Sequence, residues 1–184
     1  MKNRAWVIID YTNDFVANDG ALTCGNPGQR IEPHIARLTQ AAIDIGDFVV
    51  FAVDLHKEDD PYHPETRLFP PHNIGHTEGR LQYGKLESIY QEHRYEKNVY
   101  YMNKTRYSAF CGTDLELKLR ERGVTELHLL GVCTDICVLH TAIEAYNKGF
   151  ELVIHRNAVA SFDEQGHEWA LGHFRSVLGA EIVD

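Results

Sequence analysis

The amino-acid sequence predicts an α/β fold, in which a mainly parallel sheet of about six strands lies between two layers of helices. Short apolar, often β-branched runs alternate along the chain with longer segments whose apolar residues recur at helical spacing. This alternation is typical of βαβ units and of a parallel sheet. Two of the strand candidates are apolar at every position, as expected for strands that are covered on both faces.

The first half of the chain contains three strand candidates and one clear helix. Residues 5–9 and 48–53 are the two fully apolar runs, and residues 99–102 form a weaker one. Between the first two runs, residues 31–46 carry apolar side chains at close to helical spacing, and the segment stops at Gly46. A glycine at this position is typical of a helix C-terminus.

The second half of the chain repeats the alternation, and two of its helix candidates are again followed by a glycine. In chain order we expect a helix over 114–122, a strand over 126–131, a helix over 134–148, a strand over 151–155, a helix over 167–178 and a strand over 181–183. By contrast, the stretch of about 55–96 is rich in Pro, His, Glu and Gly and has no clear periodicity before Leu86. A long irregular excursion of this kind is usually functional.

Length, composition and charge exclude several classes of protein. The 184 residues are 43% hydrophobic and 24% charged, which is ordinary globular composition and predicts one domain over residues 1–184. The net charge of −9 disfavours nucleic acid and anionic membranes as partners, because both need a basic face. The longest apolar runs are too short to cross a bilayer, and the run after Met1–Arg4 is too short for a signal sequence. Four cysteines without such a signal predict reduced thiols in the cytoplasm.

Chemically capable residues stand at the ends of four strand candidates. These residues are Asp10, the Asp54/His56 pair, Lys104 and Cys137. Ligands bind at the carboxyl ends of parallel strands, so we expect these side chains to converge at one edge of the sheet. A single polar residue at a strand end is more often a helix cap or a solvated loop residue. Chemically capable residues at four strand ends at once are much less often a coincidence.

The histidines and carboxylates around the excursion suit a divalent metal ion. Asp54 and His56 point to the same side of an extended segment, and His63, Glu65 and His72 follow. Two histidines and two carboxylates suit Zn²⁺, Fe²⁺ or Mn²⁺. A solvated polar loop is the alternative for these residues.

Cys137 is the candidate nucleophile. It lies where a helix candidate begins after Thr134 and Asp135, and the free N–H groups at a helix N-terminus stabilise a thiolate. A small, buried apolar cysteine is the competing interpretation. The spacing of Cys133 and Cys137 matches neither a C-x-x-C motif nor a zinc finger.

Three segments resemble motifs of the isochorismatase-like cysteine hydrolases. They are Asp-Tyr-Thr-Asn-Asp-Phe at residues 10–15, Lys-Thr-Arg-Tyr-Ser-Ala-Phe at 104–110 and Gly-Val-Cys-Thr-Asp-Ile-Cys-Val at 131–138. The resemblance covers essentially the whole chain and implies a three-layer, Rossmann-like α/β/α fold. Thr12 departs from the family pattern, which has Gln at that position.

The metal-type residues resemble those of the nicotinamidase (pyrazinamidase) branch of this family. This resemblance implies hydrolysis of nicotinamide to nicotinate and ammonia for NAD salvage, activity on pyrazinamide, and one divalent ion per chain, with Zn²⁺ preferred. The implied protein ligands are Asp54, His56, His72 and, favoured over His63, Glu65. Assembly into a homo-oligomer is also expected.

The resemblance assigns the other roles as well. Asp10 serves as the base, Lys104 favours the thiolate of Cys137, and the backbone N–H groups of Cys133 and Cys137 face the oxyanion. The peptide bond between Val132 and Cys133 is expected to be cis. The resemblance also implies that the substrate ring packs against three aromatic residues, namely Phe15, Phe69 and Tyr107.

Two other functions compete with this one. The first is another amidase of the same superfamily, such as a carbamoyl-amide hydrolase. The second is a non-catalytic relative that binds metal or a partner, which would have no need for Asp10, Lys104 and Cys137 together.

Overall fold

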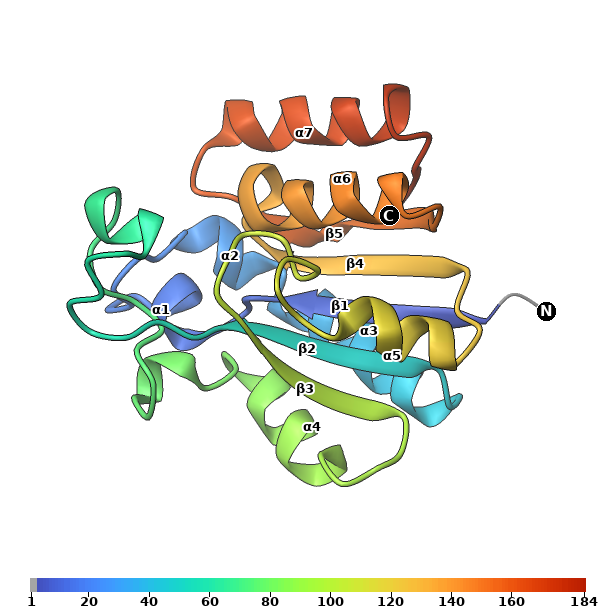
Figure 1. Ribbon diagram of the computed structural model, residues 1–184, viewed down its shortest axis with the longest axis horizontal. Coiled ribbons are helices and arrows are strands. Elements are labelled where there is room, and N and C mark those ends of the chain that lie inside the picture. Colours follow the sequence, from blue (N-terminus) through green and yellow to red (C-terminus); the bar gives the residue numbers. More distant parts are fainter. Residues whose placement is uncertain (1–2) are drawn as a thin grey trace.

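The computed structural model describes residues 3–184 and confirms the predicted parallel sheet (Figure 1). All six strands run parallel, in the order β3-β2-β1-β4-β5-β6. The strands are β1 (Arg4–Ile9), β2 (Phe48–Asp54), β3 (Val99–Lys104), β4 (Glu126–Val132), β5 (Glu151–Ala160) and β6 (Glu181–Val183). Met1 and Lys2, which belong to the signal-sequence argument, lie outside the described residues.

Helices cover both faces of the sheet. They are α1 (Asn13–Val16), α2 (Asn26–Arg30), α3 (Glu32–Asp44), α4 (Lys85–His93), α5 (Leu115–Glu121), α6 (Leu139–Asn147) and α7 (Glu164–Ser176). Side chains alternate along β1, so that Val7 and Ile9 pack with α5, α6 and α7, whereas Trp6 and Ile8 pack with α1, α3 and α4. Each face of the sheet therefore has its own hydrophobic core.

Several predicted elements differ from the structure at their ends. The strand expected over 151–155 continues to Ala160 in β5. The helix expected over 134–148 begins as a wider π-helical turn, η3 (Thr134–Val138), and becomes regular only in α6. The last long helix starts at Glu164 rather than 167, because the Asp163 side chain accepts a hydrogen bond from the backbone N–H of Gln165.

The excursion of residues 55–96 is not irregular throughout. It contains two short 3₁₀ turns, η1 (Pro64–Arg67) and η2 (Glu78–Arg80), and the nine-residue helix α4. Leu86 is the buried residue of α4, which packs against α3. One buried position leaves too weak a periodicity for the helix to be predicted from sequence.

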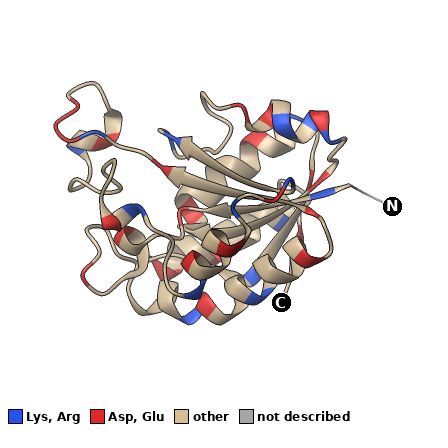
Figure 2. Cartoon of the chain, turned by 90° about the horizontal axis from the view of Figure 1, so that it is seen from below, with Lys and Arg blue, Asp and Glu red and all other residues tan. Residues whose placement is uncertain are grey.

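Figure 2 shows acidic and basic residues interspersed along the helices and loops. Among the described residues, no helix combines the length and apolar character that a membrane span requires.

The strand order places a topological switch between β1 and β4. Chain connections leave these two neighbouring strands in opposite directions across the sheet, toward β2 and β3 on one side and toward β5 and β6 on the other. Ligands of open α/β sheets bind at the carboxyl ends of strands at such a switch. Asp10 follows β1 and Cys133 follows β4, so the candidate residues lie at this point.

Gly131 allows β4 to approach β1 closely beside the switch. Its φ is +114°, and a Cβ atom there would collide with the backbone carbonyl of Ile9. Only glycine adopts this conformation without strain, and the backbone atoms it meets have little freedom to move aside.

We predict that Gly131→Ala destabilises the protein by at least about 2 kcal/mol, because the backbone must shift at a buried strand pair. Gly172→Ala is the matched control, since Gly172 lies within α7 and has open space around it. That change is expected to stabilise the helix by roughly 0.5–1 kcal/mol. Chemical denaturation of both variants measures the two effects, and equal stability of Gly131→Ala and the parent chain would contradict the first.

Candidate active site and metal centre

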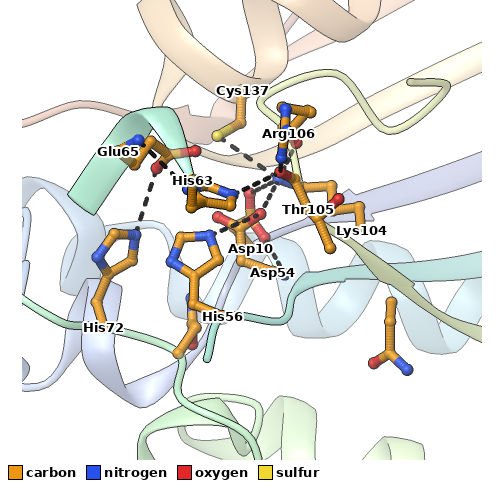
Figure 3. Close-up of polar contacts among 12 residues, drawn as sticks. Asp10, Asp54, His56, His63, Glu65, His72, Lys104, Thr105, Arg106 and Cys137 are labelled. Carbon is orange, nitrogen blue, oxygen red and sulfur yellow. Dashed lines mark hydrogen bonds and ion pairs between the residues drawn. The ribbon is translucent and has the colours of Figure 1, made fainter. Parts of the chain in front are cut away.

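The ends of β1, β2 and β3 bring a buried lysine between two carboxylates (Figure 3). Lys104 Nζ lies 2.6 Å from Asp10 Oδ2 and 2.6 Å from Asp54 Oδ1. The same ammonium lies 3.8 Å from Sγ of Cys137, which comes from η3 beyond β4. One side chain from each of the four strand ends therefore does lie at this place, and all four are buried.

The backbone holds Asp10 in an unusual conformation. Its φ is +52°, its N–H donates to the carbonyl of Ala52, and its Oδ1 accepts a 2.8 Å hydrogen bond from the N–H of Asp54. A non-glycine residue at positive φ is uncommon and persists where the surroundings impose it. Here the end of β2 fixes the carboxylate so that its second oxygen faces Lys104.

Burial controls the protonation of these groups. Burial, together with the nearby Asp54 carboxylate, raises the pKa of Asp10 to about 7, although Lys104 acts in the opposite direction. Burial alone would lower the pKa of Lys104, but Asp10 and Asp54 outweigh it and hold the pKa well above its ordinary value. Lys104 is therefore a permanent cation, and Asp10 is able to exchange a proton near neutral pH.

Burial also governs the protonation of Cys137. Lys104 does favour the thiolate, but burial and the carboxylates of Asp10 and Asp54 outweigh it and raise the pKa of the thiol well above its ordinary value. The sequence could not show how completely the sulfur is removed from water. Cys137 therefore rests as a thiol and needs a base at the moment of reaction.

A second cluster adjoins the lysine site and shares Asp54 with it. Asp54, His56, Glu65 and His72 each offer one ligand atom, and these atoms all lie within 4.8 Å of one another. Oδ2 of Asp54, Nε2 of His56 and Nε2 of His72 are buried without a hydrogen-bond partner. Each such atom costs about 1–3 kcal/mol if it is left unsatisfied. A cation held among them would satisfy all three.

The chemistry of this donor set fits a divalent transition metal. Nδ1–H of His72 donates a 2.8 Å hydrogen bond to the carbonyl of Pro70, which turns Nε2 toward the Glu65 carboxylate, 3.5 Å away. Histidines that bind metals usually donate such a hydrogen bond from their other ring nitrogen. Burial lowers the pKa of His56 to about 4, so this ring is neutral and able to ligate at neutral pH. A cavity of about 50 Å³ lies against the cluster. The residues present therefore fit a metal ion.

His63, the alternative ligand, lies outside this cluster. Its Nε2 is 2.7 Å from the carbonyl oxygen of Thr105, and its Nδ1 is 3.3 Å from the N–H of Glu65. Of the two residues that the sequence left open, the geometry places Glu65 among the potential ligands.

The three aromatic residues expected around the substrate lie on two sides of the site. Phe15 and Phe69 both contact the ring of His72, with centroids 5.2 and 6.2 Å away. Tyr107 packs on His140 at 5.1 Å and lines a largely apolar cavity of about 560 Å³ that extends to Glu65.

Several supporting residues were not found from the sequence. Asp14 accepts a 2.7 Å hydrogen bond from the N–H of Asn73, the residue after His72, and Thr12 donates to the Asn73 side chain. Arg80 donates to the Asp54 carbonyl at 2.7 Å. Asp14 and Thr12 do belong to the opening motif, which was the available signal. Arg80 lies in the excursion, where no pattern marked it.

The turn around the cysteines has the expected form. The peptide bond between Val132 and Cys133 is cis, and all four cysteines are free thiols. Sγ of Cys133 lies 3.9 Å from Sγ of Cys24.

Comparisons with known proteins agree with this architecture. Residues 4–184 match the isochorismatase domain. The chain is 66% identical to an uncharacterized isochorismatase family protein, PncA, from Bacillus subtilis over 181 residues, which cover 98% of this chain and 99% of that one. The structure of the present chain superposes on that of a nicotinamidase/pyrazinamidase PncA from Bacillus subtilis with a TM-score of 0.98. The two sequences are 65% identical, and the match covers 100% of both chains.

Two other solved structures are also similar. A pyrazinamidase/nicotinamidase from Streptococcus mutans gives a TM-score of 0.96 at 54% identity, covering 98% of this chain and 99% of that one. A pyrazinamidase from Pyrococcus horikoshii, solved in complex with zinc, gives a TM-score of 0.85 at 29% identity, and the match covers 99% of each chain. The match across nearly the whole sequence and the shared fold establish that the chain belongs to the isochorismatase family.

Proposed function

We propose that this chain is a nicotinamidase, which hydrolyses nicotinamide to nicotinate and ammonia for NAD salvage and also accepts pyrazinamide. The observation that carries the proposal is the sharing of Asp54 between the Lys104 site and the metal-type cluster. A nucleophile and a ring-binding cation would thereby be held side by side. The similarity to structures named nicotinamidase and pyrazinamidase supports the same substrate class. We further propose that residues 1–184 act as a single hydrolase domain.

The reaction begins with proton transfer from Cys137 to Asp10. The ligand-type atoms of these two residues lie within 4.8 Å of each other, and Asp10 titrates near neutral pH. The sulfur attacks the carboxamide carbon, forms a C–S bond and moves the π electrons onto the oxygen. Backbone N–H groups of Cys133 and Cys137 would face this oxyanion, a contact worth about 3–4 kcal/mol per donor in other enzymes.

Asp10 then returns its proton to the amide nitrogen, and ammonia leaves as the C–N bond breaks. Water attacks the resulting thioester and gives one proton to Asp10, which passes it to the sulfur as the C–S bond breaks and the Cys137 thiol re-forms. The product leaves as the carboxylic acid and loses its remaining proton to solvent. Lys104 remains charged throughout and lies 3.8 Å from the sulfur, so it stabilises the anion on whichever partner carries it.

Substrate orientation is the role of the second cluster. Asp54, His56, Glu65 and His72 would hold one divalent ion, for which we propose zinc. When bound, such an ion supplies a partner for the pyridine nitrogen and so fixes the direction of the ring. Phe15, Phe69 and Tyr107 would pack against the ring faces and edges.

We expect about one divalent ion per purified chain and loss of that ion in His72→Ala, measured by elemental analysis. His72 is preferred to Asp54 for this test because Asp54 also pairs with Lys104. His34→Ala, at an exposed position on α3, is the control and should retain the metal. Full metal content in His72→Ala would refute the proposed cluster.

Cys137→Ala should abolish turnover while leaving a folded protein that still binds metal, because the loss of one buried sulfur costs only about 1–3 kcal/mol. Cys133→Ala should retain much of its activity, since only its backbone is proposed to act. Ammonia release and circular dichroism measure the two properties. Substantial turnover by Cys137→Ala would exclude it as the nucleophile.

Benzamide should fall at least ~10³-fold below nicotinamide in kcat/KM, because it offers the ion no ring nitrogen, and sites built around a polar group reject analogues that lack it. Pyrazinamide keeps a nitrogen at the same position and should be hydrolysed. Isonicotinamide, with its nitrogen moved to the para position, should be poor. If benzamide came within tenfold of nicotinamide on one metal-loaded preparation, the ring would be recognised by shape alone.

A further inference from the structure

His63 lies between the proposed metal ligands and the end of β3, and both of its ring nitrogens form hydrogen bonds (Figure 3). An amide N–H only donates a hydrogen bond and a carbonyl oxygen only accepts one. Nδ1 must therefore accept from the N–H of Glu65, and Nε2–H must donate to the carbonyl of Thr105. This pairing fixes the ring in one tautomer and leaves neither nitrogen with a lone pair for a metal ion.

One of these hydrogen bonds lies within the turn, and the other joins the turn to the end of β3. His63 caps η1, the exposed turn that carries Glu65, and its neighbours Tyr62 and Leu68 are 91% and 64% exposed. Other hydrogen bonds of this turn stay local, such as those from Thr66 to Asp60 and from Thr66 to the His63 carbonyl. The bond from His63 to Thr105 reaches the end of β3 instead, one residue after Lys104.

We propose that His63 is a positioning residue, which anchors the exposed turn to β3 and so places the Glu65 carboxylate in the metal cluster. Its ring also packs on His56, with centroids 4.4 Å apart, so it supports two of the proposed ligands at once. This role rests on the proposed metal site. Residues that orient metal ligands in this way typically contribute 10–100-fold to metal affinity.

Three substitutions separate the two hydrogen bonds. His63→Phe keeps the ring and its packing but loses both bonds. His63→Asn keeps an acceptor of the right length to cap the Glu65 N–H, as Asn does at helix starts, but cannot reach Thr105. His63→Gln is long enough to donate to Thr105 through its amide nitrogen. We expect zinc affinity to fall about 10–100-fold in His63→Phe. The fall should be smaller in His63→Asn and smallest in His63→Gln.

The measurement is competition for Zn²⁺ alone between each purified full-length variant and a chromophoric chelator, without substrate. Thermal unfolding of the metal-free proteins runs alongside, because a merely structural role would lower the Tm and leave zinc affinity unchanged. His140→Phe is the matched control, since His140 lines the cavity that reaches Glu65 but lies outside the cluster. Its zinc affinity should equal that of the parent chain.

His72→Ala separates failure of this proposal from failure of the metal site. If His72→Ala binds zinc normally, the metal site itself is wrong. If His72→Ala loses zinc while His63→Phe binds it as tightly as the parent chain, the positioning role is overturned. A loss in His63→Phe as complete as that in His72→Ala would also overturn it, because His63 would then behave as a ligand.

Discussion

The buried ammonium of Lys104, held between Asp10 and Asp54, is the interaction on which the site depends. Three strand ends must meet for one lysine to lie 2.6 Å from both carboxylates. Removing one member of a buried ion pair leaves an uncompensated charge and costs about 3–5 kcal/mol. Two carboxylates against one ammonium also leave an excess negative charge. A proton on Asp10 or a cation beside Asp54 would relieve that excess, so the proposed proton transfer and the proposed metal binding share one electrostatic origin.

The parallel sheet makes this arrangement possible at little structural cost. Asp54 and Lys104 are register partners on β2 and β3, and Asp10 is fixed by the N–H of Asp54. Neighbouring strand ends thus deliver the three charged groups without long loops. The fourth group, Cys137, comes from across the switch on a π-helical turn. The excursion after β2 contributes Glu65 and His72, which lie with Asp54 in the group of potential metal ligands.

The strands and the convergence of their ends could be predicted because both follow from local patterns. Apolar runs ending in Asp10, Asp54 and Lys104 mark buried strands and the chemistry placed beside them. Helix α4 could not be predicted, because one buried leucine carries little periodicity. The choice between Glu65 and His63 was open for another reason. Both residues are ligand types in the same loop, and only the hydrogen bonds of the folded turn distinguish them.

The burial of Cys137 has a consequence for the lifetime of the protein. Its side chain is 5% exposed, and its pKa is raised, so the sulfur spends its resting time as a shielded thiol. Oxidation by peroxide and capture by stray electrophiles both require an accessible thiolate. Burial in this way shields the proposed nucleophile from the small oxidants of its surroundings.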